Sequence, residues 1–132
     1  MGITIHWQDD AQTRLLFTFE PTWTLEQFKQ AILESARMIR SQPHPVHLIA
    51  DLRAIQTVQM AVAVQGASFA ARHIEQQLGA VVIVNTNPML NTAITCARGF
   101  LSPLAGRIYT ISNPDMAERI VKHVENRLLV RV

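Results

Sequence analysis

The sequence contains little cysteine and few glycines, and both shortages exclude kinds of site. Cys96 is the single cysteine of the 132 residues, so the chain has neither an internal disulfide nor a cysteine-based zinc site. A lone thiol is typical of the reducing cytoplasm, and we expect a cytoplasmic protein. The five glycines are scattered and form no phosphate-binding loop. The five histidines lack metal-site spacing, so we expect no metal and no cofactor.

The sequence also lacks a large excess of either charge, and it has few aromatic residues and no long apolar run. Ten arginines and two lysines against ten acidic residues leave a net charge of +2 without a basic stripe. With only eight aromatic residues, the chain lacks the basic and aromatic platform typical of nucleic-acid binding. No apolar run reaches the roughly 18 residues of a membrane helix, and the first residues, MGITIHW, predict no signal peptide. We therefore expect neither nucleic-acid binding nor membrane insertion.

Apolar segments followed by turn residues recur along the chain. Ala80–Val84 is apolar without alternation, which indicates a strand buried on both faces, as in parallel sheets. Asn87 and Pro88 follow it as helix cap and first helical residue. Ile108–Ile111, which Asn-Pro also follows, repeats this pattern, and Val46–Leu52 is a third apolar strand. Repeated strand, turn and helix indicate an α/β sheet.

The beginning of the chain predicts a hairpin and then a helix. Ile3–Trp7 and Leu15–Phe19 alternate apolar and polar residues, which is typical of two antiparallel strands. Thr24 and Gln27 then form a capping box that marks the start of a helix.

A second helix is predicted from about Met60 to Leu78, with Gly79 as its left-handed cap. The expected order is therefore β-β-α-β-α-β-α-β-α in a single domain over residues 1–132. We predict an α/β fold with one mixed, mostly parallel five-stranded sheet, whose first strand is antiparallel at an edge.

This element order, with the phrases HLIADLR (47–53) and AVVIVNTNP (80–88), resembles the STAS family of bacterial anti-sigma-factor-antagonist-like domains, in the branch grouped with SEC14-like sequences. In the antagonists, Asp-Leu is followed seven residues later by Asp-Ser-Ser-Gly, and a partner kinase phosphorylates one of the serines. Here Asp51 and Leu52 are followed at that distance by Gln-Met-Ala-Val (59–62), which carries no hydroxyl group. The resemblance implies a non-enzymatic interaction or regulatory module without the phosphorylation switch.

The stretch Ala54–Ala71 carries no charge, and the loop and helix start over Asp51–Phe69 is the predicted partner surface. STAS-like domains bind through this loop and helix, so the resemblance favours a protein partner or self-association as a homodimer. The alternative is a helix that is buried more fully in its own domain. If the outward positions include small and apolar residues, they form a smooth surface suited to a partner. The predicted partner-binding residues are Thr57, Gln59, Met60, Val62, Ala63, Gly66 and Phe69.

Polar residues follow the strands at the carboxyl edge of the predicted sheet. Open α/β sheets bind ligands at this edge, and the helix N-termini there favour anions. The predicted ligand-binding residues are Asp51, Arg53, Asn87 and Asn113. The alternative is that the asparagines cap helices and that Asp51 and Arg53 form a turn. The second function is accordingly a carrier of a lipid-like or anionic small molecule, which the SEC14-like grouping also implies. No base and nucleophile pair supports an enzyme, so we expect no catalytic residues.

Overall fold

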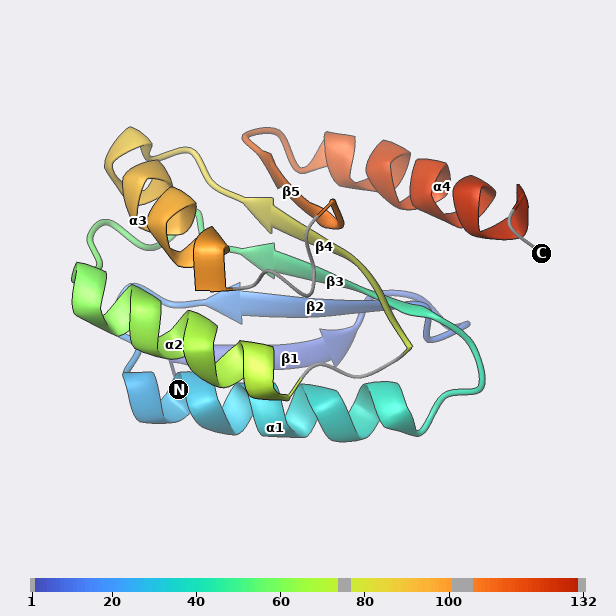
Figure 1. Cartoon of the computed structure of the whole chain (residues 1–132), viewed down its shortest axis with the longest axis horizontal. Helices are drawn as coiled ribbons and strands as arrows, with labels where there is room; N and C mark the ends of the chain where they lie inside the picture. The colour runs from blue at the N-terminus through green and yellow to red at the C-terminus, as the bar shows by residue number, and fades with distance from the viewer. Residues whose placement is uncertain (1, 74–76, 101–105, 131–132) are drawn as a thin grey trace.

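The computed structural model describes residues 2–73, 77–100 and 106–130, with the side chains of 127–130 excepted. Five strands and four helices follow one another in the predicted order, and the predicted mixed sheet is confirmed (Figure 1). The elements are β1 (Ile3–Trp7), β2 (Arg14–Phe19), α1 (Leu25–Arg40), β3 (Val46–Asp51), α2 (Met60–Arg72), β4 (Leu78–Val84), α3 (Pro88–Arg98), β5 (Ile108–Ile111) and α4 (Asp115–Val130).

The sheet order is the chain order, β1-β2-β3-β4-β5, and this decides where the helices lie. β1 pairs with β2 in antiparallel orientation, and the other three pairs are parallel. Right-handed crossovers between strands that advance in one direction place every connecting helix on the same face of the sheet. Accordingly α1, α2 and α3 share one face, whereas α4 follows the last strand and packs against β4 and β5 from the other face (Figure 1).

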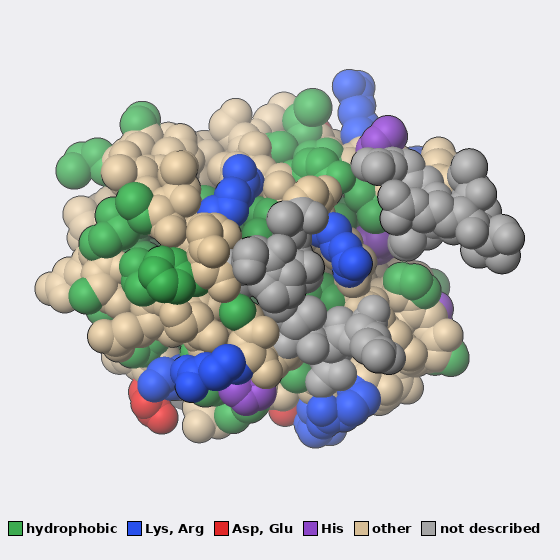
Figure 2. Space-filling model, viewed as in Figure 1, with side chains coloured by type: hydrophobic (Ala, Val, Ile, Leu, Met, Phe, Trp, Pro, Cys, Tyr) green, Lys and Arg blue, Asp and Glu red, His purple; other side chains and the backbone are tan. Residues whose placement is uncertain are grey.

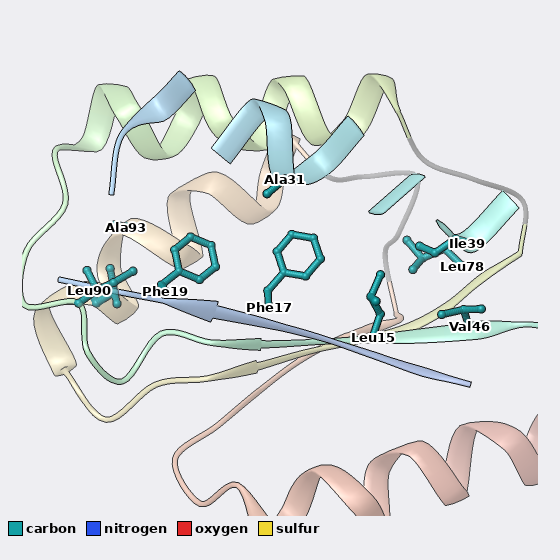
Figure 3. Packing of buried hydrophobic residues seen from close by; sticks show 10 residues of the cluster. Leu15, Phe17, Phe19, Ala31, Ile39, Val46, Leu78, Leu90 and Ala93 are labelled. Carbon is teal, nitrogen blue, oxygen red and sulfur yellow. The ribbon is translucent and has the colours of Figure 1, made fainter. Parts of the chain in front are cut away.

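The larger core lies between the sheet and the three-helix layer. Leu15, Phe17 and Phe19 alternate along β2, are buried, and point toward α1 and α3 (Figure 3). A smaller core on the opposite face joins Val82 to Val121 of α4. Because this second core involves a single helix, the three-helix face holds most of the apolar packing.

Local signals in the sequence set the starts of the helices. At α1, the Thr24 side chain accepts the backbone N–H of Gln27 at 3.1 Å, and the Gln27 side chain accepts the backbone N–H of Thr24 at 2.9 Å. At α3, the Asn87 side chain accepts the backbone N–H of Met89 at 3.0 Å, and Pro88 is the first helical residue. The predicted capping box and the predicted Asn-Pro helix start are confirmed.

The prediction that Gly79 caps the second helix is wrong. α2 ends at Arg72, and Gly79 lies inside β4, where it is buried. A Cβ atom at this position would lie 2.5 Å from Nδ1 of His47, which accepts the backbone N–H of Ala80 at 3.0 Å. Glycine is therefore needed here because an imidazole ring lies against the backbone.

Candidate functional site

The carboxyl edge of the sheet carries an ion pair between two of the predicted ligand-binding residues. The Arg53 Nε and Nη2 groups donate to the two carboxylate oxygens of Asp51 at 2.9 and 2.8 Å, and the Arg53 backbone N–H donates to the same carboxylate at 3.1 Å. These bonds, led by the side-chain bond from Arg53, hold the pKa of Asp51 below its ordinary value. Both charged groups are thus used to close the turn after β3.

The asparagines at the same edge also bond within the protein. Asn87 caps α3 and donates from its side chain to the carbonyl of Gln56. Asn85 is buried and donates to Asn91 at 2.7 Å. Asn113 accepts the backbone N–H at the start of α4 at 3.0 Å. Asn87 thus joins the start of α3 to the loop that follows Asp51 and Arg53, whereas the described bond of Asn113 stays within the turn before α4.

The predicted partner-binding residues divide into two groups at the start of α2. Thr57, Gln59 and Met60 are exposed, and the Met60 side chain retains 40% of its accessible surface. Gln59 is the N-cap residue, but its side chain makes no capping bond. These three residues therefore lie where a partner can reach them.

The other predicted partner-binding residues face inward or sideways. The prediction of Gly66 at an outward position is wrong, because Gly66 is buried against Phe28 of α1. Val62 and Ala63 are half-buried and line a cavity beneath α2. Phe69 stacks on His73, with ring centroids 4.4 Å apart, and has the cationic groups of Lys29 and Arg72 above its ring. The helix is thus turned so that its small residues meet α1 and the sheet.

The outer surfaces of α2 and α3 form a continuous area without charge, here called the α2–α3 face. The two helices pack side by side, and residues 54–71 and 77–97 include no charged side chain. Over these helices the surface consists of apolar side chains and uncharged polar or backbone atoms, with Lys and Arg at its margins (Figure 2). Its exposed residues include Thr57, Gln59, Met60, Ala61, Gln65, Met89, Thr92 and Cys96.

Two cavities lie in the layer between the sheet and the three helices. The larger one, about 190 Å³, is bounded by β2, β3, β4, α1 and the C-terminal part of α2. The smaller one, about 120 Å³, lies between α2, α3 and the loop after β3. The described residues that line the smaller cavity are all apolar, and those of the larger cavity include Ser35 and His73 as their polar members. Both of these side chains bond to a carbonyl of their own helix.

Sequence reasoning missed these cavities, although one signal for them exists. The inner side of α2 carries Ala63, Gly66, Ala67 and Ala70, and α1 places Ala36 opposite. Small residues on facing helices leave volume that larger side chains must fill from elsewhere. Whether the volume is filled depends on the spacing of the layers, which a single sequence does not encode locally.

A separate polar cluster joins α4 to the sheet. His47 is only 1% exposed, and its Nε2 lies 3.5 Å from a carboxylate oxygen of Glu125. Arg14 forms an ion pair with Glu118 at 3.0 Å. Burial lowers the pKa of His47 and so favours the neutral imidazole that accepts the Ala80 N–H; Arg14 lowers this pKa further, whereas Glu125 and Asp9 raise it. These contacts attach the last helix to β2 and β3.

Comparison with known proteins does not place the chain in a family. No protein-family model matches it, and a search of curated proteins finds no match. Among the described residues no group of three or more His, Cys, Asp or Glu could hold a metal ion. Within the same residues, no helix combines the length and the apolar character that crossing a membrane requires.

Proposed function

We propose that the protein is a non-enzymatic, STAS-like interaction module that self-associates through the α2–α3 face. The observation that carries this proposal is that two neighbouring helices carry no charged side chain before their last residues, Arg72 of α2 and Arg98 of α3. In a sequence with 12 basic and 10 acidic residues, such an uncharged area is unusual. Depletion of charge is the compositional feature that distinguishes the centre of an interface from ordinary surface.

Self-association is favoured over a charged partner by the symmetry of a dimer. A two-fold interface brings the same patch of both copies together, so any net charge on the patch meets its own sign. The α2–α3 face carries no formal charge over 54–71 and 77–97 and meets itself without this repulsion. Like charges brought together at an interface cost several kcal/mol, which is why an uncharged face suits a second copy of this chain.

Two methionines supply the apolar contacts of the proposed interface. Met60 is 40% exposed at the start of α2, and Met89 is 76% exposed at the start of α3. Methionine is flexible and polarizable, so it adapts to an opposing surface that also carries methionine. The residues around them are mainly Gln, Thr and Ala, which can be buried at small cost if their amides and hydroxyls pair across the dimer.

The STAS-like part of the proposal is supported by the position of the Gln-Met-Ala-Val sequence. The four residues that replace the phosphorylated motif of the antagonists begin at the N-cap of α2 and continue through its first turn. In the proposed dimer this turn is part of the contact. At these four positions no phosphate can be added, so the association lacks the phosphorylation switch of the antagonists.

The proposal is tested by sedimentation equilibrium of the wild-type protein and the variant Met60→Glu. A glutamate in the first turn of a helix suits the helix dipole, so the fold is expected to remain intact. In the dimer it would bury two like charges near each other and raise the dissociation constant by about a hundredfold.

Met116→Glu is the matched control. Met116 is 41% exposed and also lies in the first turn of a helix, α4, on the other face of the sheet. We expect it to leave the dissociation constant unchanged. A wild-type protein that is monomeric at all concentrations, or a Met60→Glu variant that dimerises as well as Met116→Glu, would contradict the proposal.

A second candidate function is that of a carrier for an apolar small molecule, and the two cavities favour it. Their linings contain no charged side chain among the residues that the structure describes, and an apolar cavity of about 150 Å³ in an engineered protein is known to bind benzene. The anionic alternative has less support, because Asp51 and Arg53 bind each other and the described bonds of Asn87 and Asn113 are caps and turn contacts. The site of a carried ligand is therefore placed beneath the helices rather than at the carboxyl edge.

A further inference from the structure

The two cavities share three of their lining residues. Phe19, Phe28 and Leu52 line both the larger and the smaller cavity, so together they form the partition between them. On the sheet side the partition consists of Phe19 and Leu52. Phe19 is 4% exposed in the middle of the core, and the Leu52 backbone N–H is bonded to the Val84 carbonyl at 2.9 Å. This side of the partition is fixed by the sheet.

The helix side of the partition is the ring of Phe28. Phe28 lies in the first turn of α1, is half-buried, and has its ring centroid 6.1 Å from that of Phe19 and 6.0 Å from that of Trp23. It packs against the bare backbone of Gly66, where a Cβ atom would come within 3.1 Å of the ring. A ring that faces glycine and solvent on two sides meets less obstruction to a change of rotamer than one enclosed in the core.

We infer that the two cavities form one elongated binding site for an unbranched hydrocarbon chain, with the Phe28 ring as its movable partition. This inference rests on the second candidate function and specifies its ligand. A compact molecule such as benzene fills the larger cavity alone. A linear chain that displaces the Phe28 ring extends from the larger cavity, past Gly66, into the smaller one between α2 and α3. Figure 3 shows Phe17 and Phe19, which form the floor of this path, projecting from β2 toward the helices.

The chemistry of the lining restricts the ligand to an apolar one. A charged group inside would lose its hydration without gaining a partner, because the described lining offers no ionic side chain. The hydroxyl of Ser35 already donates to the Ile32 carbonyl at 2.8 Å. Any polar end of the ligand therefore remains outside the two cavities.

The test uses 1-octanol as the linear probe and benzene as the compact one, with the full chain labelled at its isoleucine methyl groups. Ile32, Ile39 and Ile83 report on the larger cavity, and Ile55 and Ile94 report on the smaller. NMR titration with 1-octanol should shift the methyl signals of both groups with one common dissociation constant. Benzene should shift only those of the larger cavity.

Three substitutions on α1 sharpen the result. Ala36→Phe places a ring in the larger cavity and should weaken binding of 1-octanol about tenfold or more, since a packed interior leaves no second space for the chain. Gln30→Leu adds an apolar side chain to the exposed side of the same helix and should leave binding unchanged. Phe28→Leu, which thins the partition, should let benzene reach Ile55 and Ile94.

The outcomes separate the inference from the function on which it rests. The single elongated site is supported if 1-octanol shifts the isoleucine methyl signals of both cavities and if these shifts are lost in Ala36→Phe. Shifts confined to the larger cavity overturn the inference and leave a compact-ligand carrier. If neither probe shifts either group, both the inference and the carrier function are wrong.

Discussion

Filling the larger cavity should stabilise the protein, and the size of the effect follows from the structure. The larger cavity, about 190 Å³, is partly open to solvent, so a side chain that fills it gains mainly by removing apolar surface from water. Ala36 lines this cavity and is 7% exposed. Ala36→Leu adds three carbon atoms at about 0.8 kcal/mol each, less about 0.5–1 kcal/mol of side-chain entropy. We expect a gain of about 1.5 kcal/mol in the free energy of unfolding.

The assay is urea unfolding followed by circular dichroism, with Ala31→Leu as the matched control. Ala31 lies on the same helix and is 5% exposed, but it lines neither cavity. A leucine there must displace packed neighbours and should lower the free energy of unfolding by about 1–3 kcal/mol. The two variants are thus predicted to differ in sign. A loss of stability in Ala36→Leu similar to that in Ala31→Leu would refute the reasoning, because it would mean that the volume is already filled.

Two further predictions concern the contact between His47 and β4. Burial lowers the pKa of His47 in the folded state, so the unfolded chain binds the proton more readily. The free energy of unfolding should therefore be constant above pH about 6.5 and fall as the pH drops below it. In His47→Asn, the free energy of unfolding from urea titrations should no longer fall between pH 7.5 and 5.5. If it falls as in the wild-type protein, another group causes the pH dependence. Gly79→Ala should cost at least about 2 kcal/mol, because its Cβ would lie 2.5 Å from the imidazole. Gly99→Ala, where no atom lies within 4 Å of the added carbon and φ is −61°, should cost nothing measurable, and equal losses in the two alanine variants would contradict this explanation.

The order and type of the elements could be predicted because local signals and apolar periodicity agreed. The Thr24 capping box and the Asn87-Pro88 cap each mark a helix start by hydrogen bonds within a few residues. The antiparallel edge strand was predicted together with the crossover rule, whereas the sequential strand order comes from the structure. The error at Gly79, and with it the helix end predicted at Leu78, arose because glycine after a helical pattern usually means a cap. Its actual reason, the His47 ring from a strand 32 residues earlier in the chain, is a tertiary contact.

The candidate site was less predictable because α2 is apolar on more than one side. Val62, Ala63 and Gly66 are as small and uncharged as the residues on the outer surface, so no single stripe identifies the buried face. The helical periodicity predicts Met60 on the buried stripe, but this residue is 40% exposed at the start of the helix. The contribution of α3 to the same face was not, since it depends on the two helices packing side by side.

The most direct test of self-association through the α2–α3 face is the alkylation rate of Cys96 as a function of protein concentration. Cys96 is the only cysteine, is exposed on α3, and lies on the same helical stripe as Met89 and Thr92. With a small maleimide in excess, the rate constant should fall as the concentration rises through the dissociation constant of the dimer. A rate constant that stays the same from the most dilute to the most concentrated sample would contradict the proposed interface.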